Sequence, residues 1–118
     1  MLIKNALASV AVKDLSLSIK WYEKLFGCQA DSMPMPEVAE WKFELGGWIQ
    51  VYQNKERMGS SSVTFSVNNL SEQITALKNL GIDPGPQMNN DKVKAVMIKD
   101  PDGNSIAFAE ALDPNIAK

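Results

Sequence analysis

Side chains that can hold a small molecule alternate along four strand-like segments of this 118-residue chain. Because alternate side chains of a strand lie on opposite faces, each segment has one apolar face and one face of small or polar residues. The second face also carries an amide and two large aromatic rings, a lining that suits a ligand-binding hollow. Its members are Leu7, Ser9, Ala11, Trp48, Gln50, Tyr52, Ser62, Thr64, Ser66, Ser105, Ala107 and Ala109. A solvent-facing sheet is the alternative, although this set contains neither lysine nor glutamate.

Acid–base and metal chemistry have few candidates in this chain. It has no histidine, the commonest general base near neutral pH and the commonest ligand of transition metals. Cys28 is the only cysteine, which excludes an internal disulfide and favours a cytoplasmic location. Without a histidine to activate it, we expect Cys28 to be a buried structural thiol. No catalytic residue is predicted.

Charge and hydropathy argue against two classes of partner. With 12 basic and 14 acidic residues, the formal net charge is −2, so nothing indicates a nucleic-acid or anionic-membrane surface. No stretch approaches the ~20 apolar residues of a membrane span. The apolar run near the N-terminus is interrupted by Asp14 too early for a signal peptide, and we expect it to be the first strand of a repeat.

The polar segments are positioned by an internal repeat. The stretch SVAVKDLSLSIKWYEKL at 9–25 aligns with TFSVNNLSEQITALKNL at 64–80, and each predicts a strand, a polar cap and an amphipathic helix. Asp14 and Asn69 stand at the N-cap positions. The apolar stripe of the helices comprises Leu15, Ile19, Tyr22, Leu25, Phe26, Leu70, Ile74, Leu77 and Leu80.

Three further strands are expected after each helix, giving two β-α-β-β-β modules. The proline-rich stretch at 32–37 is expected to be a loop. The predicted strands are 28–32, 37–45 and 48–53 in the first half, and a short piece near 86–90, then 92–99 and 104–110, in the second. The sheet face under the helices should contain Val10, Val12, Ile49, Val51, Val63, Phe65, Val67, Ile106 and Phe108.

Two motifs carry a resemblance to a known family. The strand running into VKDLSLSIKWYEKLFG and the C-terminal DPDGNSIAFAE, within two βαβββ modules, resemble the vicinal oxygen chelate superfamily. That superfamily includes glyoxalase I, extradiol dioxygenases, fosfomycin resistance enzymes and bleomycin resistance proteins. The resemblance implies an α+β fold, one domain over 1–118, with modules at about 1–56 and 60–118 whose mixed sheet curls around a cavity.

The resemblance also implies where metal-dependent members place four ligands. In this sequence those positions are Leu7, Gln50, Ser62 and Ala107. They supply at most two neutral oxygens, whereas a divalent ion needs charged or imidazole ligands, so neither metal nor other cofactor is expected. A shifted alignment that brings Glu44 or Glu110 inward is the alternative, although alternation places Glu110 with Ile106 and Phe108.

These observations predict a metal-free protein that binds a small organic ligand, resembling the drug-sequestering bleomycin resistance proteins. Trp48 and Tyr52 would stack on the ligand, while Gln50, Ser62 and Thr64 would orient it by hydrogen bonds. The full ligand-binding set is Leu7, Ser9, Trp48, Gln50, Tyr52, Ser62, Thr64, Ala107 and Ala109. The alternatives are a lyase, isomerase or dioxygenase with an unusual metal site, and an accessory subunit whose hollow a partner fills. The resemblance further implies a homodimer.

Overall fold

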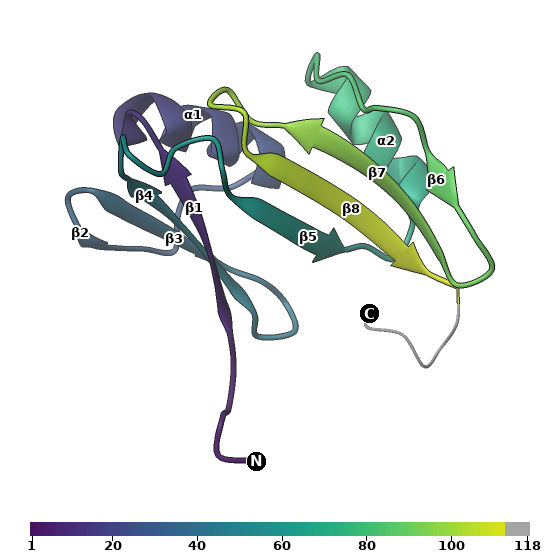
Figure 1. Ribbon diagram of the computed structural model, residues 1–118, viewed down its shortest axis with the longest axis horizontal. Helices are drawn as coiled ribbons and strands as arrows, with labels where there is room; N and C mark the ends of the chain where they lie inside the picture. Colours follow the sequence, from purple (N-terminus) through teal and green to yellow (C-terminus); the bar gives the residue numbers. More distant parts are fainter. Residues whose placement is uncertain (113–118) are drawn as a thin grey trace. The chain divides into compact units, whose positions relative to one another are not determined.

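The computed structural model describes residues 1–112; the last residues of the predicted second module, 113–118, lie outside the described part. The chain is α+β and contains two β-α-β-β-β modules, as predicted (Figure 1). The first module consists of β1 (Leu7–Val12), α1 (Leu15–Phe26), β2 (Ser32–Met35), β3 (Val38–Lys42) and β4 (Trp48–Gln53). The second consists of β5 (Ser62–Ser66), α2 (Leu70–Asn79), β6 (Met88–Asn89), β7 (Val93–Lys99) and β8 (Ser105–Ala111).

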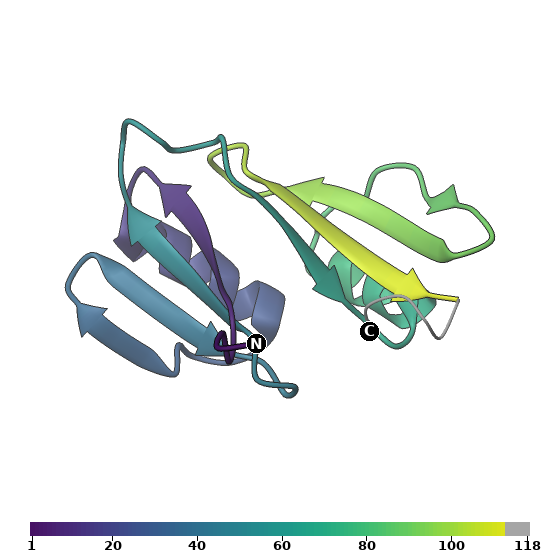
Figure 2. The ribbon, with the colours of Figure 1, turned by 60° about the horizontal axis from the view of Figure 1, so that its bottom comes forward.

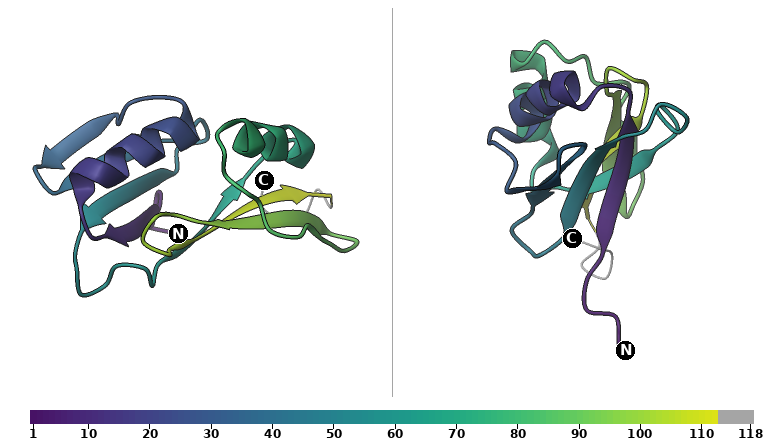
Figure 3. Two further views of the ribbon diagram at one scale, coloured as in Figure 1. Left: turned by 90° about the horizontal axis from the view of Figure 1, so that it is seen from above. Right: turned by 90° about the vertical axis from the view of Figure 1, so that its left-hand side faces the viewer.

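Each module forms one four-stranded mixed sheet with one helix on one face. The strand orders are β1-β4-β3-β2 and β5-β8-β7-β6. In each sheet the first pair of that order is parallel and the other pairs are antiparallel. Helix α1 contacts β3 and β4, and α2 contacts β7 and β8. Figures 2 and 3 show, for each sheet separately, one face covered by its helix and the other face without one.

The predicted caps start both helices. The Asp14 carboxylate accepts a hydrogen bond from the Leu17 amide, and the Asn69 side chain accepts one from the Glu72 amide at 3.1 Å. These bonds satisfy amides that have no partner inside the helix. Helix α1 ends at Gly27, whose φ of 77° is the left-handed conformation that glycine adopts without a Cβ penalty. Local chemistry alone therefore sets these boundaries.

The strand predicted at 28–32 is wrong. The structure instead has β2 at Ser32–Met35, inside the stretch expected to be a loop. Pro34 lies in this strand, and the strand order explains why it is tolerated: β2 is at the edge of its sheet, where a missing N–H costs no ladder hydrogen bond on the open side. Residues 28–30 instead lead from the helix to this edge.

The core lies between each helix and its sheet. The apolar face predicted from alternation is buried except at Phe65 and Val67, which are half-buried. Trp41 adds a large buried ring to the first unit, 5.3 Å from the Phe26 ring centroid. Leu80 departs from the prediction because it follows the last helical residue, and its side chain is 42% exposed.

The prediction of a buried Cys28 is also wrong. The residue is exposed in the bend after α1. Its carbonyl accepts a hydrogen bond from the Trp41 indole at 3.1 Å, so the backbone at this position supports the core while the thiol does not.

The chain divides into two compact units that do not follow the halves strictly. Within the described residues, the first unit contains residues 1–61 together with the turn at 101–104, and the second contains 62–100 and 105–112. We call residues 101–104 the docked turn, because within the first unit they contact β1 and the segment that follows β4. No helix of the described residues is both long enough and apolar enough to span a membrane.

Asn104 anchors the docked turn and is fully buried. Its side-chain amide donates to the Ala11 carbonyl at 2.8 Å, and its side-chain oxygen accepts from the Ser61 amide at 2.9 Å. The Ser61 hydroxyl oxygen accepts from the Ala11 amide at 3.0 Å, which completes the pairing of that residue. A carboxylate of Asp102 accepts from the Lys13 amide at 3.1 Å. The end of β1 is thus held by side chains where a strand partner would otherwise stand.

Candidate functional site

The candidate site is the face of the first sheet opposite α1, which we call the first helix-free face. Strand register determines its members, because residues directly opposite each other on neighbouring strands share a face. Gln50 lies opposite Ser9 on one side and Glu40 on the other. The face comprises Leu7, Ser9, Ala11, Ser32, Met35, Val38, Glu40, Lys42, Trp48, Gln50 and Tyr52.

Residues that lie opposite one another on β1, β4 and β3 form rows across this face, and burial increases from the row of Trp48 to the row of Tyr52. The row that contains Trp48 is the most open, with Leu7 45% exposed. The row that contains Tyr52 is the most enclosed, with Ala11 1% and Val38 6% exposed. A molecule lying on the face would therefore meet solvent beside Trp48 and protein beside Tyr52. Such a gradient suits a ligand with one apolar end and one hydrated end.

The middle row is a chain of hydrogen bonds across three strands. The Ser9 hydroxyl donates to the Gln50 amide oxygen at 3.4 Å, and the Gln50 amide nitrogen donates to Glu40 Oε2 at 3.1 Å. Both ends of the Gln50 amide are thereby engaged, which fixes its orientation. Glu40 is the terminal acceptor and is half-buried. Within the described residues, no hydrogen bond is recorded to its second oxygen.

Trp48 presents its ring to a positive charge. The Lys42 ammonium lies 5.9 Å from the centroid of the indole, within the range of a cation–π interaction. Both side chains belong to the same open row, since Lys42 lies opposite Trp48 in the register. This ring therefore already attracts a cation from the protein itself.

The corresponding face of the second sheet is smaller in its side chains and more exposed. Ser62, Thr64 and Ser66 are exposed, while Ala107 and Ala109 are half-buried. Large side chains come from β6 and β7: Met88 lies opposite Ala95, Met97 lies opposite Ala107, and Lys99 donates to the Ser105 hydroxyl oxygen at 2.7 Å. This face provides hydroxyl groups and space but no aromatic ring or carboxylate.

The predicted ligand-binding residues fall on these two faces. Leu7, Ser9, Trp48, Gln50 and Tyr52 come together on the first, where hydrogen bonds join Ser9 to Gln50. Ser62 and Thr64 lie beside Ser105 and Ala107 on the second, with Ala109 next along the same strand.

Sequence reasoning missed Glu40 and Lys42, which belong to the first helix-free face. The absence of lysine and glutamate from the predicted set was used as evidence against a solvent-facing sheet. That evidence does not hold for the first sheet, whose face contains both residue types. A signal was present: once Trp41 is assigned to the core, alternation places both of its neighbours on the opposite face.

The four positions implied for metal ligands carry no charged group. The described residues contain no cluster of three or more His, Cys, Asp or Glu that could hold an ion. The shifted alignment fails for Glu110, whose Oε1 accepts from the Leu70 amide at 2.7 Å at the start of α2, on the helix side of the sheet. Glu44 is exposed in the turn between β3 and β4.

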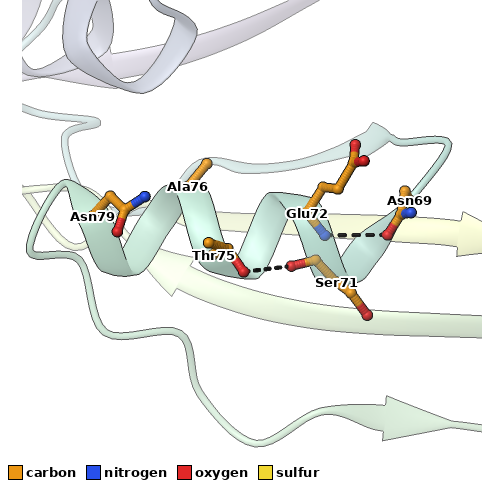
Figure 4. A pocket seen from close by; sticks show the side chains of 6 residues that line it. All are labelled: Asn69, Ser71, Glu72, Thr75, Ala76 and Asn79. Atoms are coloured by element: carbon orange, nitrogen blue, oxygen red, sulfur yellow. Dashed lines mark hydrogen bonds between the residues drawn. The ribbon is translucent and has the colours of Figure 1, made fainter.

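Two surface hollows lie on the helices and do not explain a binding function. The one in Figure 4 lies on α2, and its lining residues all come from that helix and its cap: Asn69, Ser71, Glu72, Thr75, Ala76 and Asn79. Asn69 is engaged in capping, and the Thr75 hydroxyl donates to the Ser71 carbonyl at 3.1 Å. The second hollow surrounds the end of α1 near Cys28. Both are open, and in the first the Asn69 and Thr75 side chains already bond to the backbone of the helix.

Comparisons with known proteins identify the fold. No family model and no curated protein matches the chain. Among solved structures, a glyoxalase/bleomycin resistance protein from Catenulispora acidiphila is 29% identical with a TM-score of 0.82, covering 92% of this chain and 98% of that one. TnmS3, an antibiotic binding protein from Streptomyces sp. CB03234, is 18% identical with a TM-score of 0.81, covering 94% and 98%. The oxidase ChaP-H2 is 15% identical with a TM-score of 0.75, covering 93% and 94%.

The last two likenesses concern the fold alone, whereas the first adds sequence identity over nearly the whole length of both chains. The two βαβββ modules and the turn and strand of DPDGNSIAFAE occupy the places in the structure that the motifs predict. The chain therefore has the fold of the glyoxalase/bleomycin resistance proteins, and its motifs together with the 29% identity to the Catenulispora protein support a place in the vicinal oxygen chelate superfamily.

Proposed function

We propose that the chain binds a small organic molecule on its first helix-free face and does so without a metal ion. The observation that carries this proposal is the hydrogen-bonded row of Ser9, Gln50 and Glu40, which lies between the row of Trp48 and the row of Tyr52. Aromatic rings beside a few oriented polar groups are the usual composition of a small-molecule site. Binding would sequester the ligand, with no chemical step.

The individual roles follow from the geometry of the face. Trp48 offers a half-buried ring for stacking, and Tyr52 lies in the most enclosed row. Gln50 is held by two hydrogen bonds, so it is preorganised and loses little conformational entropy when a ligand arrives. On the second sheet, Ser62 and Thr64 offer hydroxyl groups, and Ala107 and Ala109 leave space; we propose that these residues also contact ligand, as a binding surface of their own unit.

The relatives support a binding role. TnmS3 is described as an antibiotic binding protein, and the Catenulispora relative as a glyoxalase / bleomycin resistance protein. An antibiotic or a related metabolite is therefore the first ligand class to examine. The alternative of an enzyme with an unusual metal site is decided by elemental analysis of protein purified without chelator. We expect nickel, zinc, manganese and iron far below one ion per chain; a stoichiometric metal would overturn the metal-free proposal.

Intrinsic fluorescence provides the direct test of binding. Trp48 is the tryptophan on the first helix-free face, whereas Trp41 is buried in the core and Trp21 lies on α1. A ligand stacked on Trp48 should change the emission of the wild-type protein in a titration against a panel of aromatic antibiotics and metabolites. The Trp48→Phe variant should lose most of that change and bind roughly tenfold more weakly, because the larger ring is lost.

Trp21→Phe is the matched control, since it removes a tryptophan outside the face. It should retain both the fluorescence change and the affinity. A panel that leaves the Trp48 emission unchanged throughout, or a response that survives Trp48→Phe, would contradict the proposed site. The homodimer implied by the family resemblance stays a prediction, to be measured by native mass spectrometry.

A further inference from the structure

We infer that Glu40 makes the first helix-free face selective for ligands that carry a protonated amine next to a flat aromatic ring. This inference rests on the proposed binding function and specifies the chemical class of the ligand. Three features of the face carry it: a carboxylate with one oxygen to which no hydrogen bond is recorded, a ring that attracts cations, and partial burial that reduces the contact of the carboxylate with solvent.

One of the two oxygens of the Glu40 carboxylate accepts a hydrogen bond, which holds the group in place, and no hydrogen bond is recorded to the other. Gln50 donates to its Oε2, and Ser9 in turn donates to Gln50, so the row directs its hydrogen atoms toward the carboxylate. No salt bridge to Glu40 is recorded in the described part of the chain. A half-buried carboxylate with an unused oxygen is best satisfied by a charged donor, because hydrogen bonds between ionised groups are about twice as strong as neutral ones.

Trp48 supplies the second requirement, a surface for the ring next to the charge. It is next to Gln50 on the same face of β4, one step from the row that contains Glu40. The Lys42 ammonium 5.9 Å from its centroid shows that the potential over the ring favours a cation. An arriving aromatic cation would displace this exposed and flexible side chain, so Lys42 acts as an internal competitor.

Anionic ligands fit this face poorly. The only basic side chain of the face, Lys42, lies in the most open row, where solvent screens it strongly. An anion that stacks on Trp48 would approach Glu40, which is fixed by the hydrogen-bonded row. Like charges at close range raise the free energy of such a complex, so charge complementarity selects the cation.

The test compares three ligands that share one ring and differ in charge: naphthylmethylamine, naphthylmethanol and naphthoate. Isothermal titration with the full chain near neutral pH should give at least roughly tenfold tighter binding of the amine than of the alcohol, and the weakest binding for the acid. Glu40→Gln keeps the shape of the side chain and should bring the amine to the affinity of the alcohol. Circular dichroism and the urea midpoint of the variant report separately that it is folded, and the ratio of amine to alcohol affinity is the measured quantity.

Glu44→Gln is the matched control. It removes the same charge from an exposed residue of the adjacent turn, so it should leave the preference for the amine intact. Lys42→Met should tighten binding of the amine by roughly two- to fivefold, since it removes the competing cation from the ring. It should change binding of the alcohol much less.

The outcomes separate this inference from the proposed function. Equal affinities of amine and alcohol in the wild type, or an amine preference that persists in Glu40→Gln, overturn the selectivity and leave binding on this face standing. If none of the three ligands binds, the inference for aromatic amines is wrong. The proposed function is then decided by the Trp48 response to the antibiotic and metabolite panel.

Discussion

Replacing Asn104 with alanine is expected to lower the free energy of unfolding by about 3 kcal/mol, measured by urea denaturation. The side chain is fully buried and satisfies two backbone groups that have few alternatives, the Ala11 carbonyl and the Ser61 amide. Alanine removes both hydrogen bonds and leaves both groups without their partner. Each such buried group costs about 1–3 kcal/mol, which makes this substitution larger than an ordinary polar deletion.

Asn68→Ala is the control for the loss of an asparagine as such. Asn68 is exposed, so its replacement should change the free energy of unfolding by no more than about 0.5 kcal/mol. Equal effects of the two substitutions would show that Asn104 does not anchor the docked turn. A loss confined to Asn104→Ala would establish that β1, the edge strand that carries Ser9, depends on a side chain from the far end of the chain.

Much of the fold was predictable because its signals are local. The helix caps at Asp14 and Asn69, the glycine after α1 and the alternation of β4 and β8 each depend on residues a few positions apart, and the structure confirms them. The strand β2 was missed for the opposite reason. Whether Pro34 can belong to a strand depends on which side of the strand is unpaired, and that is decided by the order of the whole sheet.

The candidate site was predictable to the same extent. Its β1 and β4 residues follow from alternation, whereas Glu40 joins them only through the pairing of β3 with β4. The sequence analysis predicted a strand at 37–45 without assigning its residues to faces, and it therefore passed over Glu40, which alternation places on the face opposite the buried Trp41. The role of Asn104 could not be predicted from local sequence, because its partner Ala11 is 93 positions away and no local pattern marks the pair.

Gly59→Ala is expected to lower the free energy of unfolding by about 2–3 kcal/mol, the second large effect. Gly59 has a φ of +81°, which costs a residue with a Cβ about 1 kcal/mol. A Cβ at this position would also lie 2.6 Å from the Asp102 carbonyl oxygen, a backbone atom of the docked turn that cannot rotate away. The segment after β4 or the docked turn must therefore shift.

Gly81→Ala separates the two causes, since its φ of +76° is nearly the same while its Cβ would meet nothing within 4 Å. It should cost only the conformational part, and equal losses at the two positions would refute the contact with the docked turn.

The two large effects should also be coupled, because a turn displaced by the Gly59 substitution no longer places Asn104 against Ala11. The double variant Gly59→Ala/Asn104→Ala should therefore lose less than the sum of the single losses, by about 1 kcal/mol. Strict additivity would mean that the close approach at Gly59 and the buried amide stabilise the first unit independently, and that the docked turn does not act as one element.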